Sequence, residues 1–427
     1  MDPKILLFII FLVLLLLRVP IGIALGASAI FIIWNQSLGM SVLAPNFFSG
    51  IAKFPLLAIP FFILAGVIME KADIARRIIH LAKLIVGPIN GGLAIVTVVT
   101  AMFWGAVSGS GPATTAALGT ILIPGMVAAK YHREFAASVV SISSGLAIVI
   151  PPSIAFIVYG VITNTSVPAL FAAGILPGLV MGGFLIIAVF LISLKRGYKG
   201  ERWGRLKEIA LAFKDAFWGL MTPVVILGGI YGGIFTPTEA AAVAIFYGLF
   251  VGFFVYRTLT WSSFFQLMVD SVVISSVVMM VVTLAGIFSW VASAIGVIDA
   301  TTHFMLSLSK NPHVILILAN VVILIAGMFL DAISIYYVFL PIFVPIMMHF
   351  GWDPIWFGVV MTVNLAIGQV TPPVAVNLYV GANISGSSLE DIAREAIPLI
   401  IAAVVALLVI SFLPSLSLYL PKLWKLY

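Results

Sequence analysis

Charge is what this sequence has least of. Of its 427 residues, 8% are charged and 63% are hydrophobic, whereas soluble domains carry about a quarter charged residues. So few charges cannot cover the surface of a protein that faces water. Apolar runs of about 20 residues recur from end to end, and each is long enough to cross a bilayer as a helix. The composition therefore predicts an all-α polytopic membrane protein embedded in a lipid bilayer.

Cysteine is absent, and the 5 histidines are widely scattered. Disulfides, thiolate metal sites and cysteine nucleophiles are therefore excluded, and the histidine positions indicate no zinc cluster. The sequence contains none of the G-x-S-x-G, H-E-x-x-H and P-loop motifs, so we expect a protein that is not an enzyme. The net charge of +6 is typical of the cationic loops of a membrane protein, and we expect no nucleic-acid partner.

The apolar runs predict membrane spans at 5–17, 20–34, 55–71, 133–164, 168–194, 220–235, 238–256, 270–297, 355–384 and 394–420. Two more apolar segments, 91–128 and 313–348, are broken near their midpoints by SGSGP and LDAIS. Their short halves and polar tips favour re-entrant hairpins, although two full crossings at each segment would give the same topology elsewhere.

The distribution of lysine and arginine predicts the orientation in the membrane. With the N-terminus outside, the inside loops hold 16 of the 21 basic residues and the outside keeps 5. Because cytoplasmic loops carry the excess of positive charge, we expect a bacterial inner-membrane protein with a periplasmic N-terminus.

An internal repeat runs through the chain. Shifting the sequence by 221 positions aligns 108–177 with 329–398 and superposes four prolines of each window, where less than one coincidence is expected by chance. These prolines are Pro124, Pro151, Pro152 and Pro177 in the first window and Pro345, Pro372, Pro373 and Pro398 in the second. The first half is expected to cross the membrane five times, so the second half enters from the opposite side. Inverted-topology repeats of this kind are typical of secondary transporters.

We therefore predict three parts along the chain. The first repeat covers 1–197, with the hairpin 91–128 and the proline-broken span 133–164. A basic amphipathic helix at the inner interface covers 198–219. The second repeat covers 220–427, with the hairpin 313–348 and the broken span 355–384.

Two stretches, 203–217 and 74–85, place apolar residues on one helical face. Helices of this pattern lie in the membrane interface. They are interpreted either as arms that hold a moving hairpin domain against a static one, or as ordinary interfacial anchors.

Four short segments break the apolar pattern: SGSGPATT (108–115), IVIPPSI (148–154), GMFLDAIS (327–334) and GQVTPPVAV (368–376). Unpaired backbone groups are costly in hydrocarbon, so such breaks are tolerated where they line a cavity or bind something. Each proline pair removes two donors and frees carbonyl groups one turn earlier. Carbonyls, hydroxyls and the carboxylate of Asp331 are hard oxygen ligands that suit Na⁺.

The helix N-termini after the first two breaks favour an anion such as a substrate carboxylate. Candidate substrate contacts are Thr114, Ser153, Ser334 and Asn377. The alternative is purely structural: small residues allow close helix packing, prolines kink helices, and Asp331 caps a helix.

Several motifs occur in order along nearly the whole chain: GAVSGSGPATTAALGTILIPGM, IPPS, TPTEAAAVA, GMFLDAISI and GQVTPPVAVNLYV. In these motifs the sequence resembles the large membrane subunit of TRAP (tripartite ATP-independent periplasmic) transporters. The resemblance implies Na⁺-driven uptake of an organic anion, often a dicarboxylate or sialic acid, by an elevator movement of the hairpins and broken spans. It also implies a small four-helix membrane subunit and a periplasmic binding protein that delivers the substrate.

The resemblance further implies one Na⁺ site at each hairpin tip. Carried onto this chain, the first site falls among Ser108, Ser110, Gly145, Ile150 and Pro151, and the second among Gly327, Asp331, Gly368, Thr371 and Pro372. A self-sufficient ion-coupled carboxylate carrier of related two-hairpin fold is the main alternative function. A channel or a structural membrane subunit is a further alternative, but a channel needs a continuous polar pore and this sequence has isolated polar breaks.

Overall fold

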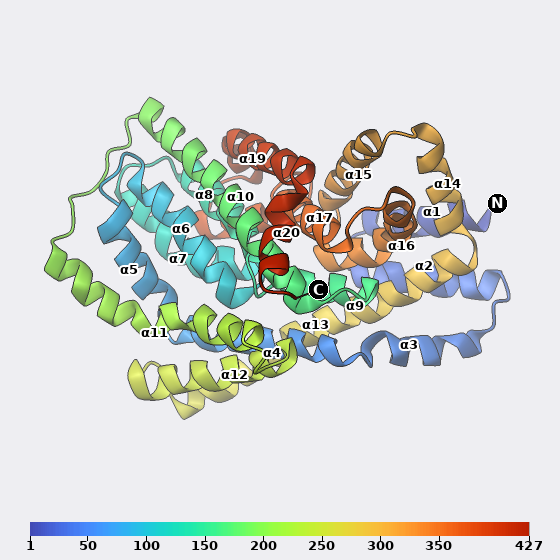
Figure 1. Cartoon of the computed structure of the whole chain (residues 1–427), viewed down its shortest axis with the longest axis horizontal. Coiled ribbons are helices and arrows are strands. Elements are labelled where there is room, and N and C mark those ends of the chain that lie inside the picture. The colour runs from blue at the N-terminus through green and yellow to red at the C-terminus, as the bar shows by residue number, and fades with distance from the viewer. Residues whose placement is uncertain (427) are drawn as a thin grey trace.

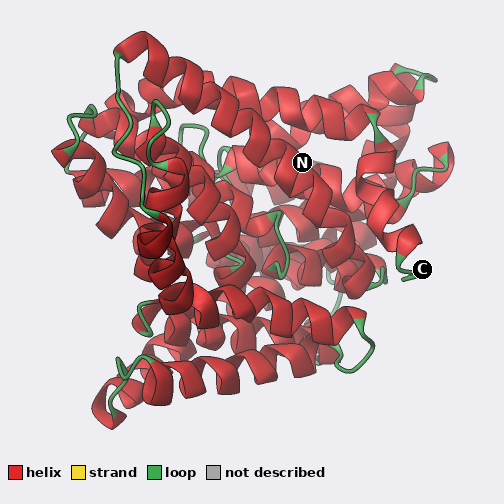
Figure 2. Cartoon of the chain, turned by 60° about the vertical axis from the view of Figure 1, so that its left-hand side comes forward, coloured by secondary structure: helices red, strands yellow, loops and turns green. Residues whose placement is uncertain are grey.

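The computed structural model describes residues 1–426 and is built of helices joined by short loops (Figures 1 and 2). Tyr427, the last residue of the second repeat, lies outside the described residues. The first half contains α1 (Pro3–Leu16), α2 (Ile21–Asn35), α3 (Leu43–Ile51), α4 (Ala58–Lys71), α5 (Ile74–Val86), α6 (Gly92–Ser108), α7 (Gly111–Ala128), α8 (Arg133–Ser144), α9 (Ile154–Thr163) and α10 (Val167–Arg196). The short 3₁₀ helices Met40–Val42, Phe54–Leu57 and Gly145–Ile148 lie between them.

The second half is also helical. It contains α11 (Leu206–Tyr231), α12 (Pro237–Phe250), α13 (Trp261–Ala294), α14 (Val297–Leu308), α15 (Pro312–Gly327), α16 (Ala332–Phe350), α17 (Pro354–Gly368), α18 (Val376–Ser385), α19 (Leu389–Phe412) and α20 (Pro414–Leu423). A π-helical turn, Val251–Val255, extends α12.

Within residues 1–426, eight helices are long and apolar enough to cross a membrane. The arms α6 and α15 and the half-spans α9 and α17 are shorter, as the broken segments of the sequence require. Two elements differ from the sequence interpretation. Helix α11 runs without interruption through the expected interface helix and the span that follows it, and the segment 394–420 is divided at Leu413, where Pro414 starts α20.

Equivalent helices of the two halves pack in a reciprocal pattern. The sequence shift pairs α7 with α16, α8 with α17, α9 with α18 and α10 with α19. Accordingly α7 packs on α18 while α16 packs on α9, and α8 packs on α19 while α17 packs on α10. This exchange of partners places both hairpins and both broken helices in one central body.

A second layer covers one side of that body. Helices α3, α4, α12 and α13 lie along the lower edge of Figure 1. Helix α4 packs on both α12 and α13, and α2 also packs on α13. The other face of α13 exposes Phe265, Val269, Val272, Val273 and Val277, which is the surface expected where a helix meets lipid.

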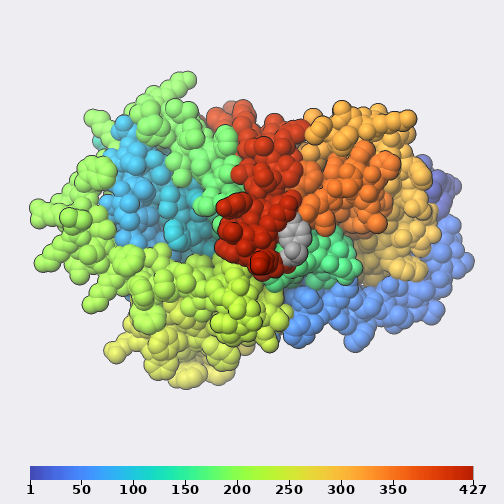
Figure 3. Space-filling model, viewed as in Figure 1, coloured from blue at the N-terminus to red at the C-terminus, as the bar shows by residue number. Residues whose placement is uncertain are grey.

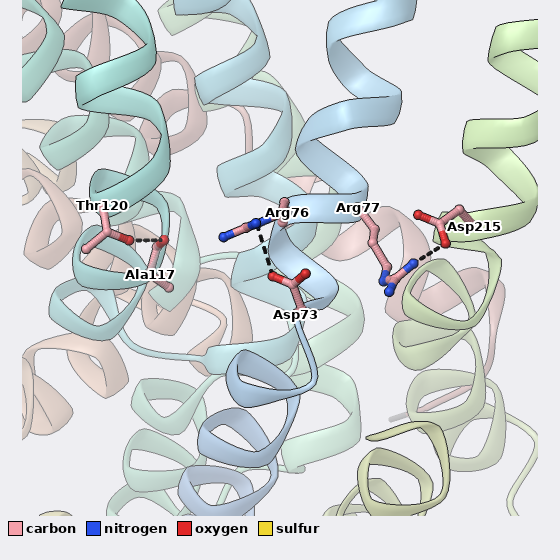
Figure 4. A network of polar contacts seen from close by, with 6 residues as sticks. All are labelled: Asp73, Arg76, Arg77, Ala117, Thr120 and Asp215. Atoms are coloured by element: carbon pink, nitrogen blue, oxygen red, sulfur yellow. Dashed lines mark hydrogen bonds and ion pairs between the residues drawn. The ribbon is translucent and has the colours of Figure 1, made fainter. Parts of the chain in front are cut away.

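The two amphipathic stretches pack against each other as α5 and the first turns of α11. Their apolar contact consists of Leu81 with Ala212 and Ala216. On the polar side, Arg77 of α5 forms an ion pair with Asp215 of α11, whereas the neighbouring Arg76 pairs only with Asp73 of its own loop (Figure 4). Because α5 also packs on α6, these helices link the first hairpin to the α11–α12 layer.

Candidate functional site

The first hairpin turns at Gly109, which has a left-handed backbone (φ +60°) and follows the last residue of α6. The hydroxyl oxygens of Ser108 and Thr114 lie 2.6 Å apart, and Ser108 Oγ also donates to the carbonyl of Ser110 at 3.3 Å. Ser110 is the N-cap residue of α7. The tip is therefore a compact turn that gathers three of the candidate residues around one cluster of oxygen atoms.

This first tip lies against the break between α8 and α9. A Cβ atom on Gly109 would be 3.1 Å from the carbonyl oxygen of Pro152, and one on Gly105 would be 2.7 Å from the Cα of Ala147. Ser153 donates to the carbonyl of Ile148 at 2.6 Å and accepts from the amide of Phe156 at 3.5 Å. Its hydroxyl thus replaces the donor that Pro152 lacks and starts α9.

The second tip lies against the break between α17 and α18, again in close backbone contact. A Cβ atom on Gly327 would be 3.0 Å from the Cα of Gly368. The amide of Val374 donates to the carbonyl of Met328 at 3.1 Å. Asp331 is the N-cap residue of α16 and accepts from the amide of Ser334 at 3.2 Å. Gly327 and Gly368 therefore meet at this interface, and Asp331 caps the helix that follows the tip.

The carbonyl groups freed by Pro372 and Pro373 have new partners. The carbonyl of Gly368 accepts from the amide of Thr371 at 3.0 Å, and that of Gln369 accepts from the amide of Asn377 at 3.1 Å. The hydroxyl of Thr371 donates to Ile367 at 2.7 Å. Each carbonyl oxygen keeps a second lone pair, so these contacts leave it able to accept a cation. The peptide bonds Pro151–Pro152 and Pro372–Pro373 are both cis.

The two broken helices also cross each other. A Cβ atom on Gly145, where α8 gives way to a 3₁₀ turn, would be 3.0 Å from the carbonyl oxygen of Ala366 on α17. Ile150 packs against Gly178 of α10, so its side chain has a packing role and only its backbone faces the break. The two candidate ion sites are thus parts of one continuous core.

A polar cluster between the repeats was not expected from the sequence. A Cβ atom on Gly111 of the first tip would lie 2.5 Å from Gln369 Oε1 and 2.8 Å from Asn377 Nδ2. Asn377 Nδ2 donates to the carbonyl of Ser141 at 3.3 Å. Gln369 Oε1, Asn377 Oδ1 and Ser141 Oγ are buried and have no hydrogen-bond partner within residues 1–426. Because buried polar groups are normally satisfied, these atoms are candidate contacts for a bound group.

Two more groups extend this polar interior. Ser334 is fully buried at the start of α16, next to Asp331. The amide of Asn364 donates to both the carbonyl and the side-chain oxygen of Asn320, at 2.8 and 2.9 Å, which ties the broken helix α17 to the hairpin arm α15. Gln369, Ser141 and Asn364 were missed in the sequence, although an amide or hydroxyl inside an apolar span is the signal that would have drawn attention to them.

The family of the chain follows from comparison with known proteins. Residues 8–416 match the family model described as "Tripartite ATP-independent periplasmic transporter, DctM component". The chain belongs to this family. It is 38% identical over 440 residues to the C4-dicarboxylate TRAP transporter large permease protein DctM of Vibrio cholerae, covering 98% of this chain and 97% of the relative.

The chain is also 42% identical over 420 residues to the isethionate TRAP transporter permease protein DctMQ of Oleidesulfovibrio alaskensis. That match covers 98% of this chain and 66% of the longer relative. The resemblance of the motifs to a TRAP large membrane subunit is therefore confirmed, and the relatives of this multi-pass protein are transporter permeases.

Among solved structures, the YdaH transporter of Alcanivorax borkumensis superposes with a TM-score of 0.66 at 14% sequence identity. The match covers 97% of this chain and 98% of that one. It confirms the expected fold, an all-helical membrane protein of two repeats with hairpins and broken helices.

Proposed function

We propose that this TRAP permease carries a small organic anion across the bacterial inner membrane, driven by Na⁺. A periplasmic binding protein delivers the anion, and a small four-helix membrane subunit completes the complex. The central body of hairpins and broken helices moves across the membrane as an elevator. The N-terminus lies in the periplasm.

The observation that carries this proposal is the meeting of both hairpin tips with both broken helices. Hydroxyl and carbonyl oxygens of Ser108, Ser110, Thr114 and Pro152 surround the first tip. The carboxylate of Asp331 and the turn at Thr371 belong to the second. Such oxygen-rich sites suit a hard monovalent cation, and we assign one Na⁺ to each.

The charge of the interior explains the coupling. Within residues 1–426, the fully buried polar side chains are those of serine, threonine, asparagine and glutamine, so buried lysine or arginine is not present there to neutralise an anion. A bound Na⁺ supplies the missing positive charge and stabilises the anion, and by linkage the anion raises the affinity for Na⁺ by the same factor. The oxygen atoms without partners at Gln369 and Asn377 lie between the tips, where the substrate would be held.

The relatives indicate the class of substrate. One relative is named for C4-dicarboxylates and another for isethionate, a sulfonate. Both are small anions with hydrogen-bonding oxygens. We propose a ligand of this class, a carboxylate or a sulfonate.

Uptake into proteoliposomes tests the function. The permease and its small subunit are reconstituted, and radiolabelled succinate and isethionate are offered with and without an inward Na⁺ gradient and the binding protein. Accumulation that requires both Na⁺ and the binding protein supports the proposal. Accumulation with Na⁺ alone supports the self-sufficient carrier instead, and a flux that ignores the Na⁺ gradient contradicts both.

A further inference from the structure

A cavity of about 510 Å³ lies outside the site described above. Its walls come from three segments, 53–55, 160–168 and 236–238. Figure 3 shows these parts of the chain, in blue, green and yellow-green, meeting below the red C-terminal helix. The first and third segments precede α4 and start α12, whereas the second joins α9 to α10. The cavity therefore lies at the boundary between the outer helix layer and the central body.

Among the described residues that line the cavity, Lys53 is the one that carries a charge. Its ammonium group donates to the carbonyl of Val161 at 3.4 Å, which uses one of its three donors. The side chains of Asn164, Thr165 and Thr238 also line the walls. A cation beside hydroxyl and amide groups has the chemistry of an anion site.

Charged groups of both signs lie near the cavity. The carboxylate next to the lining, Glu239, is engaged as a helix cap, accepting from the amide of Thr236 at 2.8 Å and from its hydroxyl at 2.9 Å. Trp424 stacks on Tyr231 with ring centroids 4.5 Å apart. That contact brings the C-terminal segment, which carries two further lysines at 422 and 425, to the end of α11 that precedes the cavity.

The volume also fits a small organic acid. Ligand pockets measure about 300–1,000 Å³, and the interior of the central body offers no buried lysine or arginine within the described residues. A positively charged side chain at the entrance to such an interior attracts the anion and raises its local concentration there. By the orientation predicted from the loop charges, the Lys53 loop faces the periplasm, the side from which the substrate arrives.

We propose that this cavity is an entry site in which Lys53 binds the carboxylate or sulfonate group of the substrate before the anion reaches the buried site. The inference rests on the proposed function as an organic-anion carrier. The ammonium group turns from the carbonyl of Val161 to the ligand, and the side-chain amide of Asn164 supplies further hydrogen bonds, whereas the hydroxyl of Thr165 is engaged with that of Thr163 at 2.8 Å.

Cysteine labelling tests the site without any need for uptake. The chain has no cysteine, so Thr165→Cys places a single thiol in the wall of the cavity. Its labelling rate is measured in the purified complex with an anionic sulfonatoethyl methanethiosulfonate and a cationic trimethylammonium analogue. Both rates are divided by the rate of a neutral methyl reagent, which removes changes in accessibility. The backgrounds are Lys53, Lys53→Gln, Lys53→Arg and, as a matched control, Lys310→Gln, which removes a lysine from an exposed loop.

We expect Lys53→Gln to lower the anionic-to-cationic rate ratio about tenfold, because one positive charge is lost from the wall of the same cavity, while Lys53→Arg and Lys310→Gln leave it within about twofold. Added isethionate should slow labelling when Lys53 is present and fail to do so in Lys53→Gln. A ratio that is the same in Lys53→Gln and Lys310→Gln, or labelling that isethionate never slows, overturns the inference. If the complex transports anions but its labelling shows no effect of Lys53 or isethionate, the entry site is contradicted and the carrier function stands. If labelling is as expected but no anion is taken up, the carrier function is contradicted.

Discussion

The contact between Gly327 and Gly368 offers the sharpest test of the second tip. In Gly368→Ala the new Cβ atom would lie 2.7 Å from the Cα of Gly327 and 2.9 Å from its carbonyl carbon. Ordinary contact begins at 3.4 Å, so the hairpin and the broken helix must separate by the difference, about 0.7 Å. Backbone atoms lie on both sides and cannot rotate away. Overpacking of this kind costs about 1–3 kcal/mol.

That strain is relieved when the tip moves away from α17, which also separates the proposed Na⁺ ligands. Ligand distances in metal sites are held within about 0.2 Å, so a shift of this size removes part of the ion site. A cost of about 1–3 kcal/mol corresponds to about a 5- to 150-fold change in an equilibrium constant. We therefore expect the Na⁺ concentration for half-maximal uptake to rise within that range, while membrane insertion is unchanged.

Gly183→Ala is the matched control, because a Cβ atom on Gly183 meets nothing within 4 Å. It adds the same methyl group to a helix of the same body. Na⁺-dependent uptake into proteoliposomes measures both variants, and the melting temperature in detergent shows whether either unfolds. If Gly368→Ala matches Gly183→Ala in Na⁺ dependence, the second tip does not form an ion site against the broken helix.

Three further predictions concern polar contacts. Asn364→Leu removes the donor that Asn320 accepts at 2.8 and 2.9 Å and should cost about 1–3 kcal/mol, so an unchanged melting temperature would argue against a structural role for this pair. The side chain of Arg77 is 21% exposed and lies over the ring of Tyr256, so Arg77→Gln should lower the free energy of unfolding by about 1 kcal/mol. The side chain of Arg76 is 71% exposed, so Arg76→Gln should change it by less than about 0.5 kcal/mol. Equal melting temperatures of the two variants would contradict the link between α5 and α11. Asp331→Asn keeps an oxygen that caps α16 but loses the charge. The Na⁺ concentration for half-maximal uptake should therefore rise about tenfold while the melting temperature stays the same. A lower melting temperature with unchanged Na⁺ dependence would show that Asp331 acts as a helix cap alone.

The hairpins and broken helices could be predicted because their signals are local. Glycine and serine at 108–111 end one helix and start another, and the proline pairs at 151 and 372 interrupt hydrogen bonding wherever they occur. The internal repeat gave a second, independent indication, since each break has a counterpart 221 residues away. The capping role of Asp331 could also be predicted, because an aspartate before an apolar run is a common helix start.

Other features depend on packing that no single segment encodes. The cluster of Gly111 with Gln369 and Asn377 joins opposite repeats, so neither segment reveals it alone. Helix α11 continues through the change from charged to apolar residues near 219, because such a change marks a membrane boundary and not the end of a helix. Helix α3, with proline and glycine in a short sequence, lacks the length and periodicity by which helices are recognised.

Movement of the first tip is the claim that one measurement tests most directly. Since the chain contains no cysteine, Ser110→Cys gives a single reporter, and its reaction with a membrane-impermeant thiol reagent is followed from each side of sealed proteoliposomes. The account predicts that Na⁺ and substrate together shift labelling from one side to the other. Labelling from one side only, at a rate that neither Na⁺ nor substrate alters, would contradict the account and leave the serines of the tip as part of a fixed structural turn.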